Sequence, residues 1–324
     1  MKYSIASIRD GSGIDFASFD LVILAITGES RAWLVADRLQ GTGAKVWALA
    51  RKNENLTAVD LDAEIAARVS HADIVLAQSF SSALSAFLNA SKDNVRVFID
   101  VSCMTRKDMA VAIDEIFSPE RESLSQITVA LGYVISKFTP PASGGSYNED
   151  IKPISQRFAG WPDDPYAPTS IVLGLGYEAA KAEGANEYFD AQETWVLFPE
   201  SPIVEFDNEV ESNNRQMVGK ARRESRLVSY PVDRPMQTFF HLNSLVQDLS
   251  ERSNLLILPF GPKIFAALSL MVAVLNPSVG VWHATGDTDL PSDDHEASDH
   301  FVAVEVTFAV ADDEQRVLTN GIGC

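Results

Sequence analysis

The feature that most constrains the fold is a repeated unit in which an apolar run of strand length is followed by a helical pattern. In the first part of the chain these runs are FDLVILAI at 19–26, KVWALA at 45–50, DIVLA at 73–77, VRVFID at 95–100 and QITVALGYVI at 126–135. Apolar runs without polar alternation are typical of strands buried on both faces, as in parallel sheets. Strands that alternate with helices predict a doubly wound α/β sheet with right-handed crossovers.

The same pattern starts again at Ser170. The segment SIVLGLGYEAAKAEGANEYF aligns with LVILAITGESRAWLVADRL, which places Glu178 opposite Glu29, although any two alternating units would share part of this match. An internal repeat predicts similar lobes. We therefore expect the α/β class, with two tandem Rossmann-like lobes, mostly parallel sheets and an internal duplication. The expected boundaries are 1–138 for the N-terminal lobe, 139–169 for a linker or irregular crossing segment, and 170–324 for the C-terminal lobe.

Composition limits the partners of the chain. Its 324 residues are 46% hydrophobic, enough for two cores, and 45 acidic residues against 26 basic ones give a net charge of −19. That charge disfavours extended nucleic acid. A small phosphorylated ligand in a local basic pocket remains compatible, because salt screens the overall field beyond about 10 Å.

The sequence also indicates a compartment. No apolar run approaches the length of a membrane span and the start lacks a signal-type segment, so we expect no membrane association. The only cysteines, Cys103 and Cys324, argue against a disulfide framework. A cytoplasmic location is therefore expected.

The strongest candidate site is the strand-to-helix elbow from Asp100 to Arg106, because ligands of doubly wound sheets bind outside the carboxyl ends of the strands. A helix beginning near Thr105 offers free N–H groups to an anion, Ser102 and Thr105 can donate hydroxyls, and Arg106 can pair with anionic oxygens. In the alternative interpretation Ser102 or Thr105 simply caps the helix and Asp100 ties down a loop. Cys103 is either an activated thiolate or a small buried filler.

A second elbow, Gly261-Pro262-Lys263, precedes the apolar run from Ile264 to Leu275. Glycine allows close approach of a ligand and Lys263 supplies a point charge, so both are expected to bind ligand; a plain loop with a proline-started helix is the alternative. The apolar run is too short to span a bilayer and predicts a helix buried on most faces.

The turns after the first strand of each lobe carry acidic residues. We expect Arg31 to join the ligand-binding set, and Glu29 and Glu178 either to hydrogen-bond a ribose or base or to pair with Arg31 and Lys181. The segment 174–179 (GLGYEA) formally matches the G-x-G-x-x-A dinucleotide fingerprint, but Glu178 would repel a pyrophosphate. We therefore assign no cofactor.

Two charged segments allow both a structural and a functional interpretation. Basic residues near 215–226 complement a helix dipole, gather ligand phosphates or meet an acidic partner. The acidic stretch from His283 to His300 contains three histidines and is a solvated loop or a divalent-ion site, but it has no established ligand spacing. We assign no metal.

Tandem Rossmann-like halves, with a hydroxyl-and-cation elbow in one and a Gly-x-Lys elbow in the other, resemble the CARF and SAVED family of bacterial second-messenger sensors. Gly261-Pro262-Lys263 stands where CARF domains have a Gly-Thr-Lys type motif, with proline in the hydroxyl position. The resemblance implies a module of an antiviral defence system that binds a nucleotide or an oligonucleotide and signals to a separate effector protein, with a homo-oligomer as a possible form.

Two alternatives stay open. One is a nucleotide- or sugar-processing hydrolase or transferase in which Asp100, Glu29 or Glu178 serves as general acid or base. The other is a scaffold subunit with an inert pocket.

Overall fold

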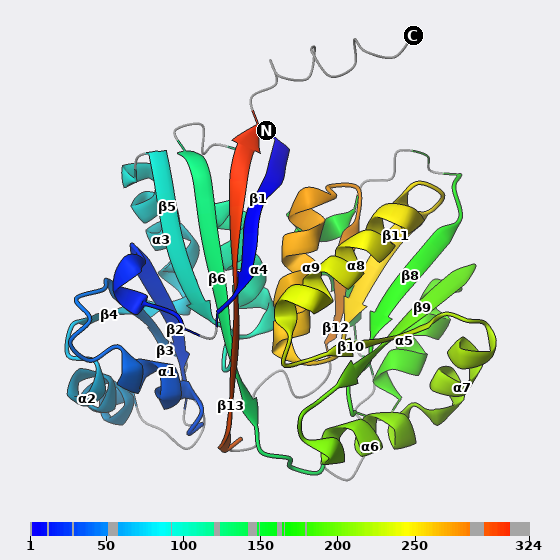
Figure 1. Ribbon diagram of the computed structural model, residues 1–324, viewed down its shortest axis with the longest axis horizontal. Coiled ribbons are helices and arrows are strands. Elements are labelled where there is room, and N and C mark those ends of the chain that lie inside the picture. The colour runs from blue at the N-terminus through cyan, green and yellow to red at the C-terminus, as the bar shows by residue number, and fades with distance from the viewer. Residues whose placement is uncertain are drawn as a thin grey trace.

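The protein is built around two sheets that stand side by side, with helices around and between them (Figure 1). The computed structural model describes residues 2–11, 13–27, 29–50, 58–91, 93–119, 124–141, 148, 150–160, 164, 166–178, 180–285 and 295–311. The α/β class expected from the apolar runs is confirmed, and both sheets are mostly parallel.

The first sheet has the strand order β1-β13-β6-β5-β2-β3-β4. Its five strands from β6 to β4 are parallel, whereas β13 runs antiparallel to both β1 and β6. The elements are β1 (Lys2–Asp10), η1 (Phe16–Ser18), β2 (Leu21–Ile26), α1 (Ala32–Arg38), β3 (Val46–Ala50), α2 (Ala58–Arg68), β4 (Ala72–Leu76), η2 (Ala77–Ser79), α3 (Phe80–Ala90), β5 (Asp93–Asp100), α4 (Arg106–Ile116), β6 (Leu124–Ser136) and β13 (Ala297–Ala311).

The second sheet has the order β10-β9-β8-β11-β12-β7, and only β7 is antiparallel to its neighbour. The elements are β7 (Asp150–Pro153), η3 (Arg157–Ala159), β8 (Thr169–Gly174), α5 (Lys181–Phe189), β9 (Glu193–Glu200), α6 (Val204–Asn213), α7 (Arg215–Arg223), β10 (Leu227–Pro231), α8 (Pro235–Ser250), β11 (Asn254–Pro259), α9 (Lys263–Leu275) and β12 (Gly280–Thr285).

The parallel cores of the two sheets share one topology. Numbered along the chain within each lobe, the strands of both cores lie in the order 3-2-1-4-5, with β2 and β8 first and β5 and β11 fourth. This order matches five of the six strands of the Rossmann order 3-2-1-4-5-6, whose switch point lies between the first and fourth strands. The shared order is what an internal duplication predicts, and it makes the elbow after β5 the counterpart of the elbow after β11.

The strand pairing corrects two of the expected lobe boundaries. β13, which we assigned to the C-terminal lobe, lies in the first sheet between β1 and β6, and Val304, Val306 and Phe308 on it are fully buried there. β7, within the expected linker 139–169, pairs with β12 of the second sheet. Each lobe thus completes its sheet with an antiparallel strand added beside its fifth parallel strand, a long-range pairing that the order of apolar runs does not encode.

The lobes share a continuous hydrophobic core in which α9 is central. Every residue of α9 from Ile264 to Val274 is buried, which confirms the helix predicted to be covered on most faces. α9 packs on α8, on β6 and on α4, its counterpart in the first lobe (Figure 1). Because α4 and α9 follow directly from the two elbows, this packing brings the elbows together.

Candidate functional site

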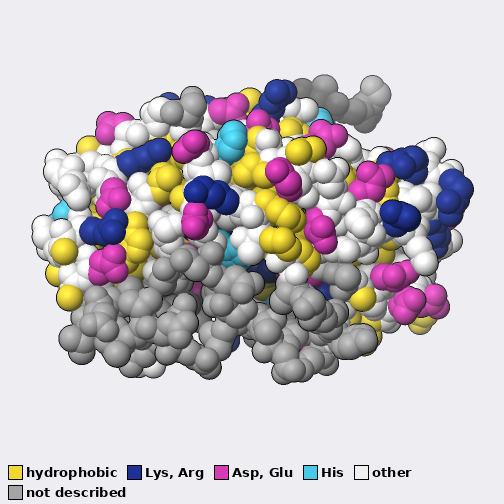
Figure 2. Space-filling model, turned by 90° about the horizontal axis from the view of Figure 1, so that it is seen from below, with side chains coloured by type: hydrophobic (Ala, Val, Ile, Leu, Met, Phe, Trp, Pro, Cys, Tyr) yellow, Lys and Arg dark blue, Asp and Glu magenta, His cyan; other side chains and the backbone are white. Residues whose placement is uncertain are grey.

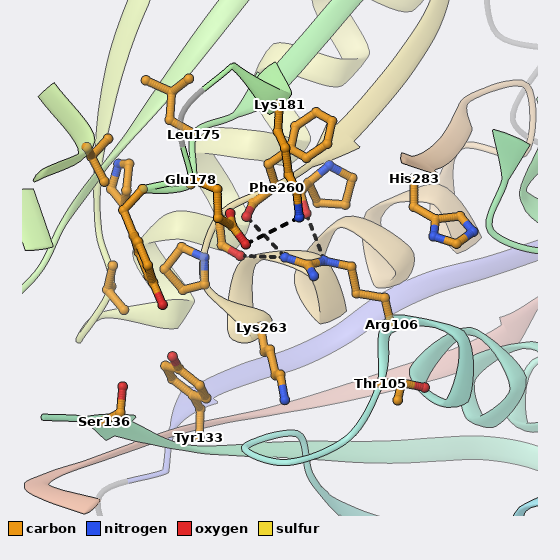
Figure 3. Close-up of a pocket in the computed structure, with 18 of the residues that line it drawn as sticks. Thr105, Arg106, Tyr133, Ser136, Leu175, Glu178, Lys181, Phe260, Lys263 and His283 are labelled. Atoms are coloured by element: carbon orange, nitrogen blue, oxygen red, sulfur yellow. Dashed lines mark hydrogen bonds and ion pairs between the residues drawn. The ribbon is translucent and has the colours of Figure 1, made fainter. Parts of the chain in front are cut away.

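A cavity of about 610 Å³ lies where the carboxyl ends of the two parallel cores meet. The loops after β2 and β5 contribute to its wall from the first lobe, and those after β8 and β11 contribute from the second. Both switch points therefore open into one pocket, which is the place where this fold binds ligands. The candidate residues that line it are Glu29, Arg31, Thr105, Arg106, Glu178, Gly261 and Lys263. Figure 3 labels Thr105, Arg106, Glu178 and Lys263.

Two of the candidates lie beneath this surface. Ser102 is fully buried, and its hydroxyl donates to Asp100 Oδ1 and accepts from the backbone N–H of Val134 at 2.8 Å. Asp100 is 1% exposed and also accepts from the backbone N–H of Ser102. Ser102 and Asp100 therefore have a structural role. The Ser102 hydroxyl is not available to a ligand, and the Asp100 carboxylate cannot reach a ligand as general acid or base.

Burial also shifts the pKa values of Asp100 and its neighbour Cys103. It raises the pKa of Asp100 to about 6, although hydrogen bonds from Ser102 and the charges of Arg31 and Lys263 oppose the shift. Burial raises the pKa of Cys103 to about 12, so Cys103 is a neutral thiol and not an activated nucleophile.

The side chains of Thr105 and Arg106 both make hydrogen bonds within the protein. Thr105 is the N-cap of α4: its hydroxyl accepts from the backbone N–H of Asp108 and donates to the Asp108 carboxylate at 2.7 Å. Arg106 crosses to the second lobe, where Nε donates to the carbonyl of Pro259 at 3.0 Å and Nη2 donates to the carbonyls of Phe260 and Gly261 at 3.1 and 3.0 Å (Figure 3). Nη1 makes no hydrogen bond within the described chain.

Lys263 makes the reciprocal contact. Its Nζ donates to the backbone carbonyl of Ser102 at 3.0 Å, so the cation of each elbow binds a carbonyl of the other elbow. Burial, together with the charge of Arg31, lowers the pKa of Lys263 to about 8. We call these contacts of Arg106 and Lys263 the interlobe latch.

Glycines in the second lobe serve packing rather than a pyrophosphate. A Cβ on Gly174 would lie 2.3 Å from the ring of Phe265, and one on Gly176 would lie 2.6 Å from the carbonyl of Phe260. Gly261 is equally confined, since its Cβ would meet the carbonyl of Leu175 at 2.7 Å. These glycines let the loops after β8 and β11 touch.

The two acidic counterparts differ in environment. Glu29 is 2% exposed and accepts from Arg31 Nε at 2.6 Å, while Arg31 also hydrogen-bonds the side chain of Tyr133. The side chain of Glu178 is 41% exposed and pairs with Lys181 at 3.6 Å (Figure 3). The first lobe thus holds its carboxylate rigidly, and the second presents its carboxylate to solvent.

The charged side chains that line the pocket are mainly basic, although the chain as a whole is acidic. Six Lys or Arg side chains line it against three carboxylates, whereas the whole protein carries −19. Sequence reasoning did not single out three of these lining cations and carboxylates, Lys107, Lys152 and Asp207, and it named Lys181 only as an ion-pair partner. The sequence analysis also missed the aromatic residues that line the pocket, Tyr133, Tyr177 and Phe206. In the sequence, each of them looks like an ordinary residue of a strand, turn or helix. We call these three residues the aromatic wall.

The basic cluster of α7 lies apart from the pocket. Arg215, Lys220, Arg222 and Arg223 are exposed and none of them lines the cavity, and Arg226 pairs with Glu193 and Glu224. Figure 2 shows Lys and Arg side chains gathered at the end of the molecule where α7 lies. These cations do not gather phosphates of a ligand in the pocket.

The described residues show neither a metal-binding cluster nor a membrane-spanning helix. Half of the acidic stretch from His283 to His300, residues 286–294, lies outside the described residues, as does Cys324. The rest of the chain that the structure describes holds no group of three His, Cys, Asp or Glu side chains placed to bind a metal. No described helix combines the length and the apolar composition that crossing a bilayer demands.

A buried hydroxyl beside the latch gives a stability prediction. The Tyr230 Oη is buried and finds no hydrogen-bond partner among the described residues, whereas the Tyr133 hydroxyl bonds Arg31. We expect Tyr230→Phe to leave the free energy of unfolding unchanged or to raise it, and Tyr133→Phe to lower it by about 1 kcal/mol. Urea denaturation of both variants tests this. A loss for Tyr230→Phe as large as that for Tyr133→Phe would contradict it.

No protein-family model matches the chain, and no curated protein matches it. Solved structures similar to it include the cytoplasmic domain of a prokaryotic cation chloride cotransporter, with 10% identity, coverage of 85% of this chain and 97% of that chain, and a TM-score of 0.25. A geranyl diphosphate methyltransferase in complex with GPP and sinefungin has 10% identity, coverage of 91% and 75%, and a TM-score of 0.23. A T. thermophilus 16S rRNA methyltransferase in complex with AdoMet and guanosine has 12% identity, coverage of 91% and 92%, and a TM-score of 0.19. At these TM-scores none of them carries an argument about function.

Proposed function

We propose that this protein binds a small nucleotide-like second messenger, a nucleotide or an oligonucleotide, in the interlobe pocket and signals to a separate effector of an antiviral defence system. The observation that carries the proposal is the cationic lining of a cavity shared by both switch points, within a strongly acidic chain. A local excess of Lys and Arg attracts an anion, and the acidic exterior rejects extended nucleic acid. The resemblance of the two elbows to CARF and SAVED sensors supports the same class.

The aromatic wall suits a base. Tyr177 and Phe206 line the pocket with their ring centroids 5.7 Å apart, and Phe206 is backed by Phe138 at 5.2 Å. Aromatic faces stack on nucleobases without regard to sequence. A cavity of this size lies within the range of small-molecule sites.

Signalling runs through the interlobe latch. An anion in the pocket competes with backbone carbonyls for Arg106 and Lys263, because both cations belong to the lining. The helices that follow the two elbows, α4 and α9, pack on each other, so a shift of either elbow changes the fit between the lobes. The effector reads that change on the outer surface.

Thermal unfolding with a panel of ligands tests the proposal. We expect ATP, cyclic di-AMP or a cyclic oligoadenylate to stabilise the protein, by about 2.7 kcal/mol at a concentration a hundredfold above Kd. Lys107→Glu reverses an exposed charge of the lining and is expected to weaken binding about fivefold. Lys220→Glu on α7 makes the same change in net charge outside the pocket and serves as the control.

Three outcomes separate the functions. Recovery of the bound nucleotide unaltered supports the sensor, and its conversion during incubation supports the hydrolase or transferase. Stabilisation by no member of the panel favours the scaffold. Equal weakening by Lys107→Glu and Lys220→Glu would place the ligand outside the pocket.

A further inference from the structure

The two oxygens of the buried Glu29 carboxylate differ in their hydrogen bonding within the described chain. Oε2 accepts from Arg31 Nε, but Oε1 is buried and has no hydrogen-bond partner among the residues that the structure describes. A desolvated carboxylate oxygen with no donor is costly, so such a group in a pocket is explained best by a donor that arrives with the ligand. Glu29 belongs to the lining of the interlobe pocket.

The carboxylate is held in place by its neighbours. Arg31 is 5% exposed and bonds both Glu29 and the Tyr133 side chain, and Tyr133 is itself 7% exposed at the end of β6. Two interactions on a buried guanidinium leave the carboxylate little freedom to turn away. The unpaired oxygen is therefore a preorganised acceptor.

The position of Glu29 excludes a phosphate from this corner of the pocket. Rossmann-type sites place the pyrophosphate at the turn after the first strand, and Glu29 occupies that turn after β2. A phosphate there would face a carboxylate already committed to Arg31. Anionic groups are left to other cations of the lining, among them Arg106 through Nη1, Lys107 and Lys181.

We infer that Glu29 is a specificity-determining residue that accepts a hydrogen bond from a hydroxyl group of the phosphorylated ligand, which makes the ligand a ribonucleotide rather than a deoxyribonucleotide. This inference rests on the proposed function. A single free oxygen matches a single hydroxyl, whereas the parallel N–H groups of a guanine edge need both oxygens of a carboxylate. Sugar recognition thus belongs to the first lobe, because Glu178 in the second lobe is half-exposed and paired with Lys181.

Calorimetric titration with matched probes tests the inference. The probes are ATP beside its 2′-deoxy and 3′-deoxy forms, and cyclic di-AMP beside its 2′-deoxy form. The wild-type protein should bind one ribonucleotide probe about tenfold to a hundredfold more tightly than its deoxy partner, as expected for a hydrogen bond to a charged acceptor. Glu29→Gln should reduce that ratio several-fold while the protein still binds the deoxy probe, which a loss of fold would not allow.

Two further variants complete the test. Glu29→Met removes the acceptor and should abolish the discrimination, and Glu178→Gln should retain it in full. A ribo-to-deoxy ratio near one in the wild-type protein, or an unchanged ratio in Glu29→Gln and Glu29→Met, overturns the inference and leaves the proposed function standing. Binding of no probe to the wild-type protein overturns the proposed function, and the inference falls with it.

Discussion

Replacement of Arg106 by alanine is expected to lower the free energy of unfolding by about 3 kcal/mol, an unusually large effect for a partly exposed side chain. The guanidinium donates to three consecutive carbonyls at the end of β11 and its loop, and hydrogen bonds from a charged donor are stronger than neutral ones. Alanine leaves those carbonyls without their donors at the junction of the lobes. Urea denaturation, with the slope m checked for constancy, measures the loss.

Matched variants distinguish the latch from a general loss of charge. Lys107 is the next residue in α4, is exposed, and also lines the pocket, so Lys107→Ala should change stability by no more than about 0.5 kcal/mol. Arg106→Lys keeps the charge but cannot reproduce the planar fork of donors, and its stability should lie nearer to that of alanine than to that of the wild type. Equal stability of Arg106→Ala and Lys107→Ala would show that the cross-lobe bonds contribute nothing.

The sequence predicts the elbows well because their signal is local. An apolar run that ends in polar residues before a helix places those residues at the carboxyl end of a parallel strand, wherever the strand lies in the sheet. The alignment of Glu178 with Glu29 likewise follows from the order of elements, and the shared 3-2-1-4-5 topology places both at the same turn. The uniform apolar character of α9 was enough to predict its burial.

The roles of the elbow residues could not be predicted, because they depend on contacts between residues far apart in the chain. Arg106 meets carbonyls more than 150 positions away, and Lys263 meets Ser102 across a similar distance. The sequence suggests that the Arg106 and Lys263 side chains are free to bind a ligand, but both donate hydrogen bonds to the other lobe. The Ser102 hydroxyl likewise donates to Asp100. The sheet to which β13 belongs could not be predicted for the same reason, because its own residues do not indicate that it pairs with β1 and β6.

The buried carboxylate of Asp100 should make the stability of the protein depend on pH in an unusual direction. Burial raises its folded-state pKa to about 6 from an unfolded value of 3.8, so the folded state binds the proton more tightly than the unfolded state does. Stability from this group is therefore fully present below the unfolded pKa and is lost as the pH rises through about 6. The complete step amounts to about 3 kcal/mol, because a tenfold difference in proton affinity between the folded and unfolded states is worth about 1.4 kcal/mol.

The difference between the wild type and Asp100→Asn isolates this step from all other titrations. The amide oxygen of asparagine still accepts from Ser102, but the side chain does not titrate. Relative to the variant, the wild type should lose about 1.4 kcal/mol between pH 5 and pH 8, a range above the sequence isoelectric point of 4.6. Ser102→Ala removes a hydrogen bond that lowers the pKa of Asp100, so the loss should move to higher pH in that variant. A pH-independent difference between the wild type and Asp100→Asn would mean that Asp100 is ionised in the folded protein throughout this range, and that Arg31 and Lys263 outweigh its burial.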